Sequence, residues 1–179
     1  LQAAEIAADL IANGTEVVVI DASVGFGKSI CAELVRQLLS TRMLYVAPKN
    51  ELITQMQRSL PFAETLKGRS NYPHGGPNGF RDFKRGISCA ECQRQALCKE
   101  KRYCAYHRDK DKFIKGSVSI TNTAYYLVAA NYLKMFNPNN PSKDFKGWQG
   151  GNYLTVFDEA DTLADSMLGF WETTITQSF

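Results

Sequence analysis

"VVVIDASVGFGKSICAELV", residues 17–35, is the stretch that decides the fold. Its apolar run from Val17 to Ile20 predicts a strand buried on both faces, and from Ser29 to Leu39 the pattern changes to the period of a helix. The glycines lie where the two patterns meet. A turn there can direct successive backbone N–H groups and the positive end of the helix at one anion. The stretch therefore predicts a phosphate-binding loop between a strand and a helix.

Residues 22–29, "ASVGFGKS", fit the nucleotide-binding pattern G-x-x-x-x-G-K-[ST], with Ala22 in place of the first glycine. The alternative is a glycine turn that binds nothing. In the nucleotide interpretation, Lys28 places its charge on the β- and γ-phosphates of ATP, and Ser29 offers a hydroxyl to Mg²⁺. The groups expected to surround the phosphates belong to Ser23, Val24, Gly25, Phe26, Gly27, Lys28 and Ser29.

A second motif, "YLTVFDEAD" at 153–161, places two carboxylates after an apolar strand. In a parallel sheet this is the edge where ligands bind. Asp158 can hold Mg²⁺, directly or through water, and Glu159 can orient and deprotonate an attacking water. An acidic pair here can also be the start of a helix, favoured by the helix dipole. Because a phosphate-binding loop precedes it, the pair is better explained as the hydrolytic half of an ATPase, with Lys28, Asp158 and Glu159 as catalytic residues.

Strands and helices alternate along most of the chain, which predicts an α/β fold with a parallel sheet and helices on both faces. The period of the apolar residues predicts helices over 2–12, 28–40, 50–60 and 123–136, and strands over 16–21, 43–47, 63–66, 117–121 and 153–157. A loop is expected over 137–152. We therefore expect residues 1–67 and 117–179 to form one domain.

Residues 68–116 break this pattern, because they are polar, basic and rich in cysteine, with no long apolar periodicity. We expect a small inserted subdomain that is held together by its ligands rather than by a core. Between Arg81 and Lys115 the chain has 11 Lys or Arg and 5 Asp or Glu, so the excess of +6 outweighs the net charge of +3 for the whole chain. Such a segment is either a solvated surface or a patch that follows nucleic-acid phosphates.

Four of the five cysteines, Cys89, Cys92, Cys98 and Cys104, lie within 16 residues of this segment. Cys31 stands alone on the helix after the glycine turn, where a small buried core residue is the simplest interpretation. Four clustered cysteines in a cytosolic protein favour a metal ion or cluster over disulfides. Structural zinc sites generally use paired knuckles, and one Cys-x-x-Cys followed by two spaced cysteines fits them loosely. The residues alone leave zinc and an iron–sulfur cluster open.

Aromatic residues are interleaved with the cations of the segment, and bases of a single strand can stack on such rings. The alternative is a small core around the metal centre, which we favour for any one ring. Packing is likewise the preferred interpretation of the stripe after residue 124. The rings concerned are Tyr72, Phe80, Phe83, Tyr103, Tyr106 and Phe113, and the stripe is Tyr125, Tyr126, Leu127, Tyr132 and Leu133.

The length and composition suit one core in a soluble protein. No apolar run approaches the roughly 20 residues that span a membrane, and no signal pattern begins the chain. We therefore expect a cytosolic protein that does not bind membranes. The chain starts inside a helical pattern and stops soon after a strong motif, so we expect it to be part of a longer protein.

Several stretches resemble motifs of one helicase superfamily. "DEAD" at 158–161 resembles motif II of superfamily 2 helicases, and "LYVAPKNELITQM" at 44–56 resembles motif Ia, which touches the nucleic-acid backbone. A narrower match comes from "LKGRSNY" at 66–72, the cysteines at 92, 98 and 104, and "VSITNTAYYL" at 118–127. In this order they resemble the DinG and XPD family of DNA helicases, whose first motor domain carries an inserted iron–sulfur domain.

The resemblance implies a RecA-like motor domain with an inserted [4Fe-4S] subdomain, ATP and Mg²⁺ as cofactors, and single-stranded or forked DNA as the partner. It implies 5′ to 3′ movement, and a location in the cytoplasm at the nucleoid, or in the nucleus of a eukaryote. The second motor domain is not in these residues, so we expect the chain alone to bind nucleotide weakly and to unwind nothing. A different class stays open: a zinc-containing nucleic-acid-binding module whose ATP site is a switch without unwinding.

The ligand set of the cluster also follows from the resemblance. In the family a cysteine shortly after the "GRSNY" run is the first ligand, and His74 holds that place here. Four thiolates suit iron better than three thiolates and an imidazole. We therefore expect Cys89, Cys92, Cys98 and Cys104 to hold the cluster, with His74 nearby but unbound.

Overall fold

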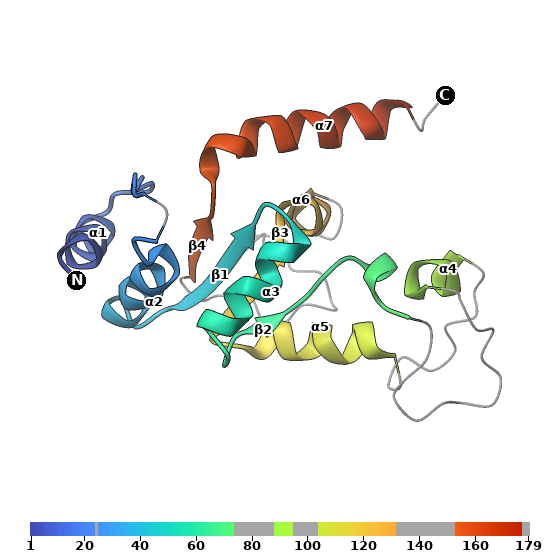
Figure 1. Cartoon of the computed structure of the whole chain (residues 1–179), viewed down its shortest axis with the longest axis horizontal. Helices are drawn as coiled ribbons and strands as arrows, with labels where there is room; N and C mark the ends of the chain where they lie inside the picture. The colour runs from blue at the N-terminus through green and yellow to red at the C-terminus, as the bar shows by residue number, and fades with distance from the viewer. Residues whose placement is uncertain (24, 74–87, 95–103, 132–152, 177–179) are drawn as a thin grey trace.

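A computed structural model describes residues 1–23, 25–73, 88–94, 104–131 and 153–176 of the chain. Its centre is a four-stranded sheet in the order β2-β3-β1-β4, and every pairing between neighbours is parallel (Figure 1). The strands are β1 (Arg42–Ala47), β2 (Glu64–Thr65), β3 (Val118–Asn122) and β4 (Tyr153–Phe157). The predicted α/β class with a parallel sheet is confirmed.

Helices cover both faces of this sheet, because side chains alternate along its central strand. Met43, Tyr45 and Ala47 of β1 share a buried cluster with residues of α2 and α3, whereas Leu44 and Val46 pack with residues of α5 and α6. The helices are α1 (Gln2–Ala12), α2 (Lys28–Leu38), α3 (Asn50–Ser59), α4 (Cys89–Arg94), α5 (Ala105–Lys115), α6 (Thr123–Asn131) and α7 (Leu163–Thr176). No helix in the described ranges is both long and apolar enough to cross a membrane.

The strand expected over 16–21 is not formed, so this prediction is wrong. The segment lies outside the sheet, between α1 and α2, and leaves Val17 76% and Val19 82% exposed. Only Val18 packs against the cluster that joins α1 to α2. The physical reason is that residues 16–21 do not pair with another strand. Within the described residues, β4 is an edge strand that pairs only with β1. Without a neighbouring strand, the backbone of 16–21 forms no ladder of inter-strand hydrogen bonds.

The end of the cysteine-rich segment forms a helix that the sequence pattern did not predict. Phe113 and Ile114 of α5 are buried in the cluster on the second face of the sheet. The Arg42 guanidinium donates to the carbonyl oxygens of Ile114 and Gly116, and Ser119 Oγ donates to the Phe113 carbonyl at 2.6 Å. One face of α5 therefore packs in the core of the sheet domain, although we expected residues 68–116 to have no core.

Two of the three described aromatic rings of the segment are core residues, and the third, Tyr72, is half-buried and packs against the same cluster. Tyr106 is 2% exposed and Phe113 is fully buried, so neither ring offers a face on which a base could stack. Tyr125 and Leu127 of α6 are buried as well, which confirms the packing interpretation of that stripe. Phe80, Phe83, Tyr103, Tyr132 and Leu133 lie outside the described residues.

Candidate nucleotide and thiol sites

The glycine turn before α2 has the backbone that the phosphate-binding interpretation requires. Gly25 has φ +87° and Gly27 has φ +85°, in the left-handed region that glycine adopts without a steric penalty. Gly27 is the N-cap of α2, and its carbonyl accepts the first helical hydrogen bond from Cys31 N–H at 2.9 Å. Unpaired N–H groups of a first helical turn can bind an anion. Val24 lies outside the described residues.

The two side chains that follow the turn differ in their surroundings. Lys28 is the first residue of α2 and is exposed, so its ammonium is accessible from solvent. Ser29 is half-buried, and its Oγ lies 2.9 Å from Met56 Sδ of α3. Cys31 is buried between α1 and α2, which confirms it as a core residue.

The acidic pair continues from β4 at the carboxyl end of the sheet. Asp158 N–H donates to the Val46 carbonyl at 3.0 Å, which fixes the backbone of Asp158 beside β1. Glu159 then adopts φ +49°, a left-handed conformation that costs a non-glycine residue about 1–2 kcal/mol. Its N–H donates to Asp158 Oδ1 at 3.1 Å. A strained residue directly after a strand end is a common feature of functional sites.

The structure brings the two predicted magnesium ligands together around one tyrosine. The Asp158 carboxylate and the Ser29 hydroxyl both lie close enough to the buried Tyr45 phenol to act on its pKa, in opposite directions. Burial and the negative charge of Asp158 raise the pKa of Tyr45 well above its ordinary value. Motifs separated by more than 120 residues in the sequence thus meet at one point. The sequence analysis missed Tyr45; the signal available was a single hydroxyl within an apolar strand.

Three asparagines form a row at the same edge of the sheet. Asn122 Nδ2 donates to Asn50 Oδ1 at 2.6 Å, and Asn50 Nδ2 donates to Asn71 Oδ1 at 3.2 Å. Asn50 lies after β1 at the start of α3, Asn71 lies after β2, and Asn122 is the last residue of β3. The row joins the three stretches that resemble helicase motifs between the glycine turn and the acidic pair.

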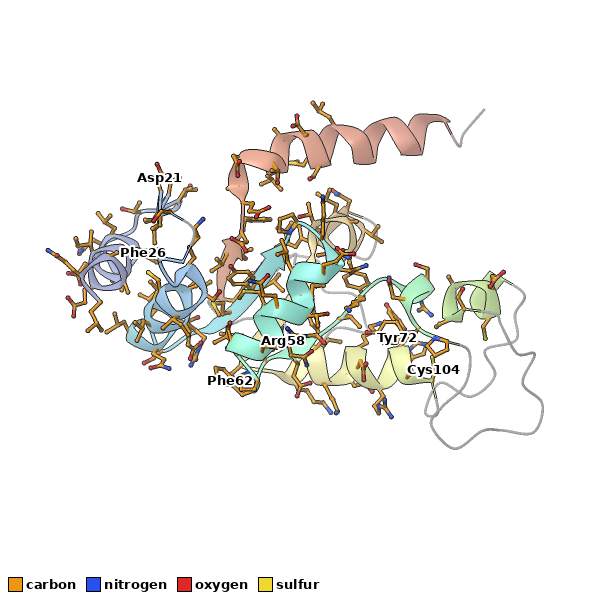
Figure 2. All side chains as sticks on the ribbon, in the orientation of Figure 1. Asp21, Phe26, Arg58, Phe62, Tyr72 and Cys104 are labelled. Carbon is orange, nitrogen blue, oxygen red and sulfur yellow. The ribbon has the colours of Figure 1, made fainter. Side chains whose placement is uncertain are left out.

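Two of the four predicted cluster ligands converge at the far end of the molecule from the glycine turn. Cys89 opens α4 and Cys104 is the N-cap of α5, and their Sγ atoms lie 3.6 Å apart. This is longer than the S–S bond of about 2.05 Å in a disulfide. Figure 2 shows Cys104 beside Tyr72, remote from Asp21 and Phe26 of the segment before α2. A backbone hydrogen bond joins the two segments at this site: Cys89 N–H donates to the Tyr72 carbonyl at 2.8 Å.

Cys92 is buried one turn after Cys89 on α4, whereas Cys98 and His74 lie outside the described residues. Within the described ranges, no three His, Cys, Asp or Glu side chains form a group that could hold a metal ion. The observed fit to a metal centre is therefore the convergence of two thiols that are 15 residues apart in the sequence.

Arg69 is a neighbour of this thiol pair that the sequence analysis did not single out. Its guanidinium lies 4.2 Å from the centre of the Tyr106 ring, and its Nη1 is 3.7 Å from Cys89 Sγ. Burial, followed by the Cys104 thiol, raises the pKa of Cys89 to about 12, and the charge of Arg69 acts in the opposite direction. A cation beside the sulfur favours the thiolate, which is the form that binds metals. Metal binding would therefore displace a proton from Cys89.

Comparisons with protein-family models, with curated proteins and with solved structures find no match to this chain. The function is therefore argued from the two sites.

Proposed function

We propose that the chain is the first motor domain, with an iron–sulfur insert, of an ATP-dependent DNA helicase similar to DinG and XPD. The observation that carries this proposal is that both motifs lie against the same strand, β1. Ser29 Oγ lies 2.9 Å from Met56 Sδ, and Met56 packs in one buried cluster with Tyr45 of β1. Asp158 N–H donates to the carbonyl of Val46 of β1 at 3.0 Å. A hydroxyl after a glycine turn and a carboxylate after a parallel strand are the two protein groups that hold Mg²⁺ in P-loop ATPases. Oxygen donors suit this hard ion, which keeps several waters of its own.

Each residue of the site has a separate task in ATP hydrolysis. The turn from Gly25 to Gly27 directs backbone N–H groups at the phosphates, and Lys28 neutralises charge on the β- and γ-phosphates. Mg²⁺ bound by Ser29 and Asp158 would supply further neutralisation of the phosphate charge. Glu159 orients the attacking water and takes up its proton. The exposure of Lys28 and Glu159 leaves both accessible to a nucleotide from solvent.

The DNA part of the proposal has its own support. The asparagine row lies at the carboxyl edge of the sheet, where Asn71 is exposed and where Lys49, which directly precedes Asn50, is exposed as well. Amides and lysines of this kind contact nucleic-acid phosphates, which position the protein without reading the sequence. The basic segment that follows would extend this path to the thiol site, and the proposed direction of movement along single-stranded DNA is 5′ to 3′.

The proposed cluster has a zinc alternative, which one distance favours. Two Zn–S bonds of about 2.3 Å in a tetrahedron place their sulfurs about 3.8 Å apart. The 3.6 Å between Cys89 and Cys104 is close to that value. In this second proposal the chain is a zinc-containing nucleic-acid-binding module with an ATP-dependent switch. Iron and zinc analysis of protein isolated without air distinguishes the two.

The motor function is tested on the full-length protein. We expect ATP hydrolysis that single-stranded DNA stimulates, and strand separation on forks with a 5′ tail. The Glu159→Gln variant should bind ATP without turning it over, because it keeps the shape of the site and loses the base. DNA that changes nucleotide binding but never turnover would favour the switch instead. Hydrolysis by Glu159→Gln near the wild-type rate would refute the assigned site.

A further inference from the structure

The thiols of Cys89 and Cys104 are close enough for chemistry between the two sulfurs. Their Sγ atoms lie 3.6 Å apart, whereas the sulfurs of a disulfide are about 2.05 Å apart. Small rotations of the two side chains close the remaining gap of about 1.5 Å. Both residues are free thiols in the structure. The two sulfurs can therefore form a bond with each other whenever no metal holds them.

Hydrogen bonds hold the backbone on each side of this pair. Cys89 N–H donates to the Tyr72 carbonyl at 2.8 Å. Arg108 N–H donates to the Cys104 carbonyl at 3.0 Å in the first turn of α5. The Tyr72 and Tyr106 rings then pack edge to face, with their centres 5.5 Å apart. Two groups held at a fixed short distance react far faster than the same groups free in solution.

The two thiols differ in their access to solvent. Cys89 is 1% exposed, whereas Cys104 is half-buried. A small oxidant therefore reaches Cys104 first, because the protein shields Cys89 from it. The Arg69 guanidinium lies 3.7 Å from Cys89 Sγ, where it can balance negative charge on that sulfur. The pair thus contains one thiol that can attack an oxidant and a second that can only attack the first.

We propose that Cys89 and Cys104 form a reversible disulfide in the metal-free protein, with a low-molecular-weight disulfide such as oxidised glutathione as the oxidant. The inference goes beyond the proposed motor function, and it is the same for iron and for zinc. The bond consumes two sulfurs that would otherwise bind the metal. The oxidised protein should therefore take up no metal until a thiol reduces it.

The reaction consists of two thiol–disulfide exchanges. The Cys104 sulfur attacks one sulfur of oxidised glutathione, the S–S bond of the oxidant breaks, and one reduced glutathione leaves with the Cys104 proton. The Cys89 sulfur then attacks the Cys104 sulfur of this mixed disulfide, and a second reduced glutathione leaves with the Cys89 proton. Two protein thiols are thereby oxidised by two electrons, and one oxidised glutathione is reduced to two thiols.

The test uses the full-length protein after EDTA and dithiothreitol have removed its metal without air. The protein is separated from both reagents and incubated with oxidised glutathione, its remaining thiols are alkylated, and its peptides are mapped by mass spectrometry. We expect one peptide pair, cross-linked through Cys89 and Cys104 and lighter by two hydrogen atoms. Cys31, buried between α1 and α2, should not be cross-linked. Protein that holds its metal should show no cross-link, and dithiothreitol should restore metal uptake by the oxidised protein.

Two variants test the order of the steps. Cys89→Ser lacks the second thiol, so glutathione should remain attached to Cys104. Cys104→Ser lacks the accessible thiol, so Cys89 should gain neither glutathione nor a cross-link. Cys98→Ser is the matched control, since it removes another thiol of the segment and should leave the cross-link unchanged. The wild-type map needs no substitution, so it decides the question even where a variant does not fold.

The outcomes separate this inference from the proposed function. Wild-type protein that binds neither iron nor zinc would refute the proposed metal centre, whereas its cross-link would still decide the inference. A metal-binding protein whose metal-free form gives no cross-link would refute the inference alone. So would a cross-link from Cys89 to Cys92 or to Cys98 in its place, or an equal cross-link in the metal-loaded protein.

Discussion

The two candidate sites lie in opposite kinds of environment. At the nucleotide site, Lys28 begins α2 and Glu159 follows the end of β4, and both are exposed, so that backbone groups and waters can contribute to binding. At the thiol site, Cys89 and Cys92 are buried, and an arginine and aromatic rings surround Cys89 and its partner Cys104. The difference matches the ions proposed for them. Mg²⁺ keeps its waters, whereas thiolate centres are shielded from solvent.

The largest expected effect is on the thiol site. In the full-length protein, the Cys89→Ser variant should lose the metal and its visible absorption. The substitution removes one thiolate ligand and leaves Cys104 without the neighbouring thiol with which it would bind the metal. Cys31→Ser is the matched control, since Cys31 is buried elsewhere, and His74→Ala should also keep the metal. Metal analysis and absorption spectra measure the outcome. If His74→Ala loses the metal and Cys89→Ser keeps it, the histidine is the ligand.

The next effect concerns the exposed site. Lys28→Ala should lower ATP hydrolysis about 10²–10³-fold, because a preorganised positive group is removed from the phosphates. Arg58→Ala, which removes an exposed cation from α3, should leave turnover unchanged. Steady-state ATPase assays of the full-length variants give the comparison. Equal losses in both variants would mean that general charge, and not this site, controls the rate.

A smaller effect is expected where the cysteine-rich side meets the sheet. The buried hydroxyl oxygens of Tyr106 and Tyr125 are hydrogen-bonded at 2.9 Å. The Arg69 guanidinium also packs on the face of the Tyr106 ring. Tyr125→Phe leaves the Tyr106 hydroxyl without this partner, so the free energy of unfolding should fall by about 1–3 kcal/mol. Urea unfolding measures it, with Tyr126→Phe as a less buried control. A variant as stable as the wild type would show that the pair contributes nothing net.

The smallest effect concerns the helix that begins with Lys28. Glu33 of α2 accepts hydrogen bonds from Arg36 at 2.7 and 2.8 Å, and these lower the pKa of Glu33. A carboxylate with a lowered pKa stabilises the fold above its unfolded pKa, and this contribution is lost as the pH falls through the folded pKa. Glu33→Gln should therefore cost up to about 1 kcal/mol at neutral pH and less at about pH 3.

Urea unfolding of Glu33→Gln at the two pH values tests this, and Glu5→Gln on the exposed side of α1 is the control. A cost that does not depend on pH would assign the effect of Glu33 to packing.

The sequence predicted most of the sheet because local patterns determine it. The strand expected over 153–157 has the observed bounds of β4, and the helix expected over 2–12 has those of α1. The same reasoning failed for Val17 to Ile20, where an equally apolar run stays exposed. The hydrophobic period of a segment indicates that it can form a strand. Whether the strand forms depends on whether the rest of the chain places the edge of another strand beside it.

The candidate site was predictable to a similar extent. Ser29 and Asp158 were expected to act together from their motifs, and this stays a prediction; the structure places Ser29 against Met56 and the Asp158 backbone beside Val46 of β1. Tyr45 and Arg69 were not found, because their importance comes from contacts between segments far apart in the chain. A tyrosine in an apolar strand and an arginine in a polar loop have no local pattern that distinguishes them from ordinary residues.

The route of the chain through β2 and β3 has a consequence for modularity. These strands are parallel neighbours, so a crossover must join them, and α5 is the longer of the two described α-helices between them. The Tyr72 and Tyr106 rings, which flank the excursion through α4, have their centres 5.5 Å apart. The chain thus leaves and returns at almost the same place. A few glycines joining Tyr72 to Ala105 would keep the crossover helix, and the thiol site could be gained or lost as one unit while the sheet order stayed the same.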